Sequence, residues 1–296
     1  MRAAVLIAVV GTCVWSFAQN KAASQNTQSG QTQSGQAQSS QTPAGAAQAA
    51  PTGKRPPQAK TQAEFDDFKA GAALTDPAAV EKAANDFATK YPESELRVVL
   101  YKAAMQKYQQ ANNADKMMET AQKALTYDPD DPEALIAVAQ VLAERTRDTD
   151  LDKDQRLAEA KKDADHALQT IETDLPTIGY PPEQLTAYKG FLRSNAYAVL
   201  GTLASNAKDW PQAEADLRKS IDAFPQQLDS VAVLRLAVAL DMQNKFPEAL
   251  KYANQAVDLT KDHADSPSGK AARAEQDRLT KLNSGTAPGQ SAPAKN

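Results

Sequence analysis

The residues best suited to bind a metal ion form one acidic run, Asp148-x-Asp150-x-Asp152-x-Asp154, followed by Glu159. An EF-hand loop places its calcium ligands in this alternation, and Glu159 stands where the closing carboxylate belongs. The same loop needs Gly after its third ligand, however, and Lys153 occupies that position. The pattern therefore favours a solvated acidic turn in which Asp152 or Asp154 begins the next helix. A calcium-responsive module using residues 148–159 is the alternative interpretation.

Other chemistry-bearing residues are isolated. The chain has two histidines, His166 and His263, far apart in sequence, and one cysteine, Cys13. None of the usual motifs for a serine nucleophile, a zinc-binding His pair, a phosphate loop or a dinucleotide site occurs. We therefore expect no metal site, no cofactor and no catalytic activity.

The elements that position these residues are helices. Thr61-x-x-Glu64 has the form of a capping box, and Asp131-Pro132 and Ser266-Pro267 are typical helix starts. No segment alternates apolar and polar residues as a half-buried strand does. The chain is thus predicted to be all-α from Thr61 onward.

One stretch, Ser194 to Pro225, shows how the helices pair. Its apolar residues have helical spacing on both sides of the turn Ala207-Lys208-Asp209. Gly201 and Ala213 are small where two antiparallel helices must approach, and a larger side chain there would force them apart. The unit resembles a tetratricopeptide repeat (TPR), whose W-x2-L-G-x2-Y…A-x3-F…P pattern recurs about every 34 residues.

The same spacing recurs on both sides of this unit. Tyr101-x2-Ala104-Met105-x2-Tyr108 precedes it and Val233-x2-Leu236-Ala237-x2-Leu240 follows it. The resemblance implies a TPR-like helix-turn-helix solenoid of about five helix pairs over residues 61–283. A polar-backed helix from Pro267 to Leu282 would cap its end.

The N-terminus indicates export. Met1-Arg2, an apolar run from Ala3 and small residues up to Ala18 form a predicted signal peptide over residues 1–18. Residues 19–60 are a Gln/Ser/Ala/Pro-rich linker that we expect to be disordered, as is the tail 284–296. A lipid anchor at Cys13 is an alternative to cleavage after Ala18. No transmembrane segment is expected in the mature chain. The signal peptide predicts a location in the periplasm or outside the cell. Lipidation at Cys13 would instead attach the protein to the outer membrane.

The expected partner is a protein or peptide. The net charge is −4 and Lys and Arg are scattered, which is unlike a nucleic-acid-binding surface. In a TPR stack the first helix of each pair lines the concave face, an amide-rich groove suited to a peptide or a partner helix. The residues predicted there are Lys102, Gln106, Gln109, Gln140, Glu144, Thr202, Ser205, Asn206, Val238 and Asp241.

A further resemblance concerns the cellular setting. Phe87…Tyr91-Pro92-x-Ser94 is similar to a repeat junction of bacterial envelope TPR proteins, including outer-membrane-assembly lipoproteins. It implies a scaffold of the bacterial cell envelope, with a lipid-anchored component of an outer-membrane assembly as the alternative. The Lys/Asn/Arg clamp of chaperone-tail-binding TPR domains is matched by Lys102 alone, which disfavours that ligand class.

Overall fold

The computed structural model describes residues 53–176 and 181–284. All regular elements in these ranges are helices, apart from one isolated bridge between Lys54 and Pro176. The all-α prediction is confirmed. The predicted signal peptide, Cys13, most of the predicted linker and residues 285–296 lie outside the described residues.

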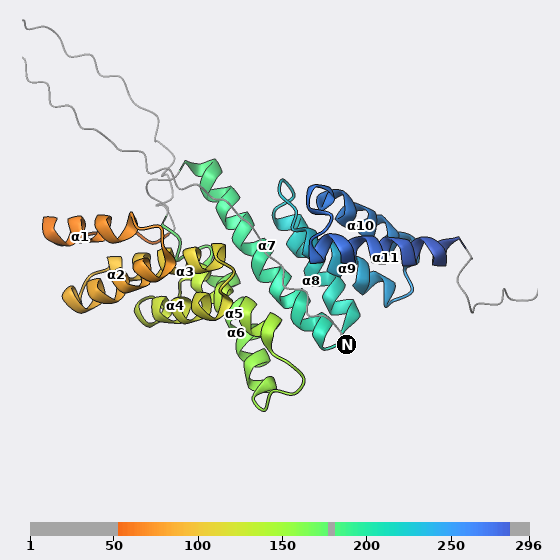
Figure 1. The fold of residues 1–296 in the computed structure, drawn as a ribbon, viewed down its shortest axis with the longest axis horizontal. Helices are drawn as coiled ribbons and strands as arrows, with labels where there is room; N and C mark the ends of the chain where they lie inside the picture. The colour runs from red at the N-terminus through yellow and green to blue at the C-terminus, as the bar shows by residue number, and fades with distance from the viewer. Residues whose placement is uncertain (1–52, 177–180, 285–296) are drawn as a thin grey trace, which may run out of the picture. The chain divides into compact units, whose positions relative to one another are not determined.

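Eleven α-helices and one short 3-10 turn make up the described chain (Figure 1). Their bounds are α1 Gln62–Ala72, α2 Pro77–Lys90, α3 Leu96–Gln110, α4 Ala114–Tyr127, α5 Pro132–Arg145, α6 Lys153–Thr170, α7 Pro182–Asn206, α8 Trp210–Ala223, α9 Ser230–Asp241, α10 Phe246–Leu259, η1 Lys261–His263 and α11 Pro267–Asn283. Five pairs and a last helix therefore follow one another, as the repeat pattern predicted.

Side-chain caps begin most of these helices. The Thr61 hydroxyl accepts the backbone N–H of Glu64, and Asp76, Asp131 and Asp209 cap α2, α5 and α8 in the same way. Each such bond satisfies one of the N–H groups that a helix start leaves without a partner. Asp152 does occupy the N-cap position of α6, but its side chain makes no capping bond.

Three turns between paired helices share one backbone conformation. Asn112, Lys208 and Asn244 have φ values of 55°, 60° and 60° in the turns after α3, α7 and α9. The next N–H in each turn bonds five residues back, as from Asp209 to Ala204 O at 2.9 Å. This is the Schellman ending, which needs a left-handed residue at that position.

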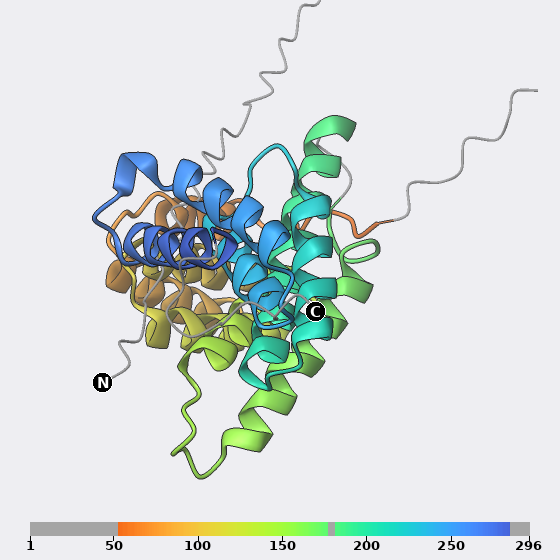
Figure 2. The ribbon, with the colours of Figure 1, turned by 90° about the vertical axis from the view of Figure 1, so that its right-hand side faces the viewer.

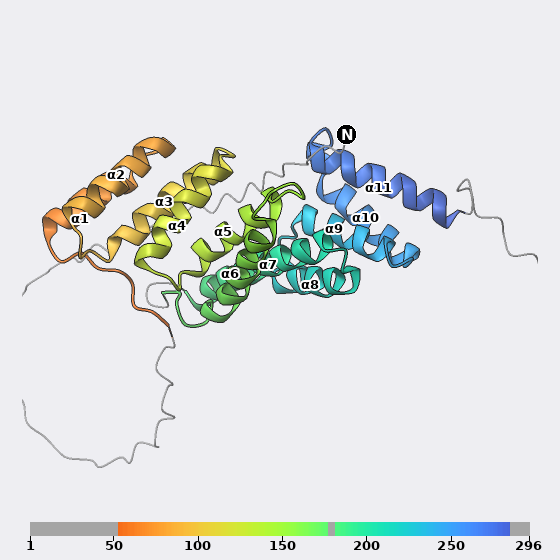
Figure 3. The same cartoon turned by 90° about the horizontal axis from the view of Figure 1, so that it is seen from below.

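Helices of a pair pack along each other, and successive pairs stack side by side (Figure 3). Gly201 lies at a close contact between α7 and α8. A Cβ built on it would lie 2.6 Å from Cγ of Leu217. The sequence suggested Ala213 as the facing small residue; Ala213 is buried, but the residue that meets Gly201 is Leu217.

The second half of α7, from Ser194 to the turn at Ala207, was predicted, but its first half was not. The helix begins at Pro182, well before Ser194, and its first half packs on α5 and on the segment after α6. Leu192 of this half is buried in one apolar cluster with Ile171 and Leu175, and Leu185 packs against it. No element was predicted for residues 182–193, although Leu185 and Leu192 have helical spacing.

The last helix closes the array. Ala272 and Leu279 of α11 are buried against α9 and α10, while Lys270, Asp277 and Lys281 on its other side are exposed. The predicted capping role is thus visible in the burial pattern.

The α5–α6 connection extends away from the helices (Figure 2), and Leu151 in it is fully exposed.

Candidate protein-binding site

Two of the predicted binding residues, Lys102 and Gln106 of α3, are engaged within the protein. Lys102 Nζ lies 2.8 Å from Asp131 Oδ2 and 2.9 Å from Glu133 Oε2. Gln106 Nε2 donates to Glu133 Oε1 at 2.6 Å, and the Tyr188 hydroxyl donates to Glu133 Oε2 at 2.8 Å. We call these five residues the polar clasp. It joins α3, the start of α5 and the first half of α7.

The polar clasp favours the charged forms of Glu133 and Lys102. Burial alone would raise the pKa of the Glu133 carboxyl, but the charge of Lys102 and the donated hydrogen bonds outweigh it and lower that pKa. Burial would lower the pKa of Lys102, yet Asp131 and Glu133 raise it well above its ordinary value. Both residues are therefore charged at neutral pH, and neither is available to a partner without cost.

Four more predicted residues are also engaged within the fold. Thr202 and Ser205 donate to carbonyls of their own helix at 2.7 Å. Asn206 Nδ2 donates to Ala143 O of α5 at 3.1 Å, and Asp241 of α9 pairs with Arg278 of α11. Asn206 and Asp241 thus join neighbouring helices, whereas the hydroxyls of Thr202 and Ser205 are satisfied within α7.

The other four predicted residues remain open. Gln109 and Glu144 are exposed, and Gln140 and Val238 are partly exposed. The one hydrogen bond between Gln140 and Glu144 is long, at 3.5 Å. The side of α5, α7 and α9 that carries Gln140, Glu144 and Val238 is called the first-helix face below.

Two residues that the sequence analysis did not name belong to the first-helix face. Arg235 makes no salt bridge within 4 Å among residues 53–176 and 181–284, although its charge acts on Glu144. Met242 is 51% exposed. Met242 follows Asp241 as Asn206 follows Ser205, so the repeat phase could have identified it.

Electrostatics on this face are set by Glu144. Desolvation by the surrounding helices raises the pKa of its carboxyl, while the positive charge of Arg235 opposes that rise. A carboxylate that is accessible yet poorly solvated gains from a hydrogen-bond donor or cation brought by a ligand. With Val238 and Met242 nearby on α9, the face offers one charged and one apolar contact region.

The acidic turn does not gather its carboxylates. Asp148 pairs with Lys153 at 2.8 Å, and Asp150 accepts the backbone N–H of Arg147 at 2.9 Å. Within the described ranges, no three His, Cys, Asp or Glu side chains are grouped so as to hold a metal ion. His166 lies 2.9 Å from Asp130 instead.

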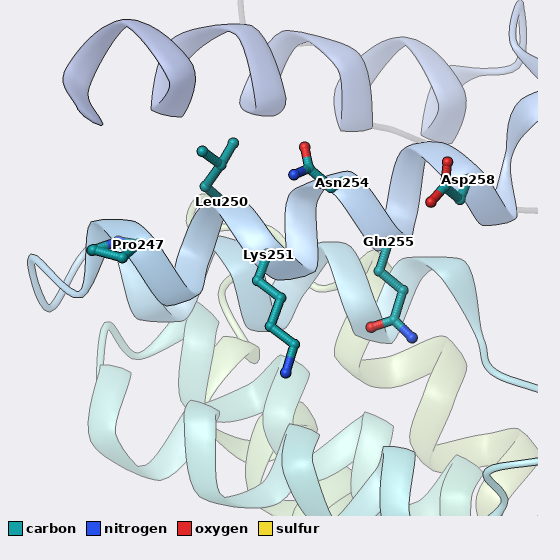
Figure 4. A pocket seen from close by; sticks show the side chains of 6 residues that line it. All are labelled: Pro247, Leu250, Lys251, Asn254, Gln255 and Asp258. Carbon is teal, nitrogen blue, oxygen red and sulfur yellow. The ribbon is translucent and has the colours of Figure 1, made fainter. Parts of the chain in front are cut away.

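A shallow hollow lies along α10, lined by Pro247, Leu250, Lys251, Asn254, Gln255 and Asp258 (Figure 4). Leu250 and Asn254 point toward α11, where Asn254 accepts a hydrogen bond from Gln276 at 2.8 Å, whereas Lys251 and Gln255 point the other way. All six residues come from one helix, so no opposing wall encloses a ligand.

No family description matches the chain, and no curated protein matches its sequence. Among solved structures, TTC0263, a thermophilic TPR protein in Thermus thermophilus, aligns at 12% identity and a TM-score of 0.46, covering 73% of this chain and 98% of that chain. The assembly chaperone of RpL4 (Acl4, residues 1–338) aligns at 12% identity and a TM-score of 0.39, covering 75% of this chain and 98% of that chain.

These likenesses concern the path of the backbone alone. The fold assignment rests on the chain itself: five helix pairs, left-handed turns at equivalent positions in three of them, a glycine at a helix contact and a polar-backed last helix. None of the helices in the described ranges combines the length and apolar character that crossing a bilayer requires. The chain is a TPR-like helical array.

Proposed function

We propose that this protein is a non-catalytic scaffold that binds a peptide or a partner helix on its first-helix face. One observation carries the proposal: Gln140, Glu144, Arg235, Val238 and Met242 remain accessible where neighbouring polar residues are satisfied internally. A segment with an apolar side chain for Val238 and Met242 and a donor for Glu144 fits this face.

The proposed location is the bacterial cell envelope. It is supported by the basic start, apolar run and small residues of positions 1–18, and by the similarity of Phe87…Ser94 to envelope TPR proteins. Export would place the linker 19–60 between the signal or membrane and the helices. No nucleic acid is expected as a partner.

Capture from an envelope extract tests the binding site. The bait is the full mature chain, compared with an Arg235→Glu/Met242→Lys variant of the first-helix face. A matched control carries Lys251→Glu/Leu259→Lys on α10, because it makes the same kinds of change at exposed positions. Both variants should unfold like the parent.

We expect one protein to be enriched on the parent and the α10 control and lost on the first-helix variant. Equal recovery on all three baits would place binding on another surface, and recovery on none would remove support for a scaffold. Gln106→Glu is unsuitable as a probe, since it would set a second carboxylate against Glu133.

The lipid-anchored form is tested separately by the intact mass of the mature protein. Lipidation at Cys13 would retain residues 13–18 and add acyl mass, whereas signal cleavage after Ala18 would leave a chain beginning at Gln19.

A further inference from the structure

The segment before α1 is seated on an acidic surface. Lys54 Nζ lies 2.6 Å from Asp128 Oδ1 and 3.7 Å from Asp174 Oδ1. Arg55 places both terminal nitrogens of its guanidinium on the two oxygens of Glu95, with Nη1 to Oε2 at 2.7 Å. The backbone N–H of Gln58 also donates to Glu95 at 3.3 Å.

The three carboxylates come from separate elements. Glu95 precedes α3, Asp128 follows α4, and Asp174 belongs to the connection between α6 and α7. The backbone of Lys54 runs alongside Pro176 of the same connection. The segment is therefore extended and bridges the second helix pair to the connection that follows α6.

Within residues 53–176 and 181–284, no other cation forms a salt bridge with any of these carboxylates. Asp128 and Asp174 both lie close to the same Lys54 Nζ, so without the segment they would repel each other. The Arg55 guanidinium lowers the pKa of Glu95, as a bound cation should. The placement of the three carboxylates thus matches the charges of an extended segment with two adjacent basic residues.

We propose that Glu95, Asp128 and Asp174 form an acidic docking surface for such a segment, which residues 54–58 of this chain occupy as a displaceable intramolecular ligand. Only three residues separate Gln58 from the start of α1, so the local concentration of the segment is in the millimolar range or above. The exposed ion pairs of the segment are individually weak and are screened by salt. The short covalent connection to α1 therefore contributes much of what holds the segment in place. The acidic docking surface holds residues 54–58, and none of its three carboxylates belongs to the first-helix face.

The test uses full-length chains labelled with 15N and a peptide of residues 53–60. In the Lys54→Glu/Arg55→Glu variant, repulsion from the three carboxylates should displace residues 54–58 from the acidic docking surface. The peptide should then shift the amide signals of Glu95, Asp128 and Asp174, with a Kd of about 1 mM or tighter at low salt. In the parent, where the internal segment competes at a millimolar or higher local concentration, binding should be at least about twofold weaker.

A matched control reverses two adjacent lysines elsewhere, Lys161→Glu/Lys162→Glu on α6, and should bind the peptide as weakly as the parent. For the Lys54→Glu/Arg55→Glu variant, 1 M salt should weaken binding by about tenfold or more. No shifts in that variant, or equal binding by all three chains, would overturn the proposal.

Discussion

Gly201 of α7 faces Leu217 of α8 so closely that one methyl group would not fit. A Cβ on Gly201 would lie 2.6 Å from Cγ and 2.9 Å from Cδ2 of Leu217, and 3.3 Å from its backbone nitrogen. Leu217 is fully buried, so it has little room to move aside. The contact is one of two that limit the distance between the helices of the fourth pair, since a Cβ on Gly190 would lie 2.7 Å from the backbone oxygen of Ala223.

Gly201→Ala should therefore lower the free energy of unfolding. Overpacking costs about 1–3 kcal/mol, and the better helix propensity of Ala returns up to about 1 kcal/mol. We expect a net loss of about 1–2 kcal/mol in urea unfolding, and a larger loss for Gly201→Leu.

A double variant identifies the cause. Leu217→Ala alone leaves a cavity and should cost about 2–5 kcal/mol. Gly201→Ala/Leu217→Ala should be more stable than the sum of the single effects, because each change relieves the defect of the other. Strict additivity would mean that the two residues do not define the helix spacing.

Lys208 offers a stabilising change. Its φ of 60° is a left-handed conformation, which costs an L-residue about 1–2 kcal/mol. The equivalent turns carry Asn112 and Asn244, and Asn tolerates this region better. Lys208→Asn should raise the midpoint of thermal unfolding slightly, and Lys208→Gly should raise stability by up to about 1 kcal/mol.

The neighbour Ala207 is the control for this prediction. Its φ is −76°, an ordinary helical value, so Ala207→Gly gains nothing in the folded state. That variant should lose about 0.5–1 kcal/mol through the added freedom of the unfolded chain. If both glycines destabilise equally, the left-handed turn is not under strain.

The fold could be predicted because its signals are local. Helix starts such as Thr61, tight turns such as that at Lys208, and the small residue Gly201 are each defined by a few neighbouring residues. Their repetition gave the five pairs and the capping helix. The first half of α7 was missed because its residues lie outside the repeat unit and pack on the connection after α6.

The binding residues were less predictable, because a repeat position fixes where a side chain points and not what it meets. Lys102 and Gln106 have the right phase, but Asp131 and Glu133 from the next pair take their hydrogen bonds. Tyr188, which completes that clasp, comes from the unpredicted part of α7. Only the spatial neighbours distinguish Lys102, whose ammonium is paired within the protein, from Glu144, whose side chain is exposed.

Calcium should leave this protein unchanged. Lys153 occupies the position where an EF-hand needs glycine and pairs with Asp148, which would be the first ligand. Calorimetric titration to millimolar calcium should give no heat of binding, and the unfolding midpoint should not move. Lys153→Gly is the sharper comparison, because it supplies the glycine that an EF-hand loop needs. Saturable calcium binding by the unaltered chain would instead support the calcium-responsive module.

The polar clasp should make the free energy of unfolding decrease as the pH falls through the folded pKa of Glu133. Removal of Lys102 should reverse the direction of this dependence. In the parent, the pKa of Glu133 is lowered below 4.5, so its contribution is complete above about pH 4.5 and is lost as the pH falls through the folded value. Lys102→Met leaves the Glu133 carboxylate partly buried without its cation, which should cost about 2–3 kcal/mol at pH 7 after allowance for its partial exposure.

Burial then dominates in the Lys102→Met variant and should raise the pKa of Glu133 above 4.5, so acidification from pH 7 toward pH 4 should narrow the gap to the parent. Lys102→Met/Glu133→Gln removes both charges and should recover much of the loss, with little dependence on pH over this range. Urea unfolding of the three chains at pH 7, 5.5 and 4 measures these differences. A gap that stays constant for Lys102→Met would show that Lys102 contributes through its packing rather than through the charge of Glu133.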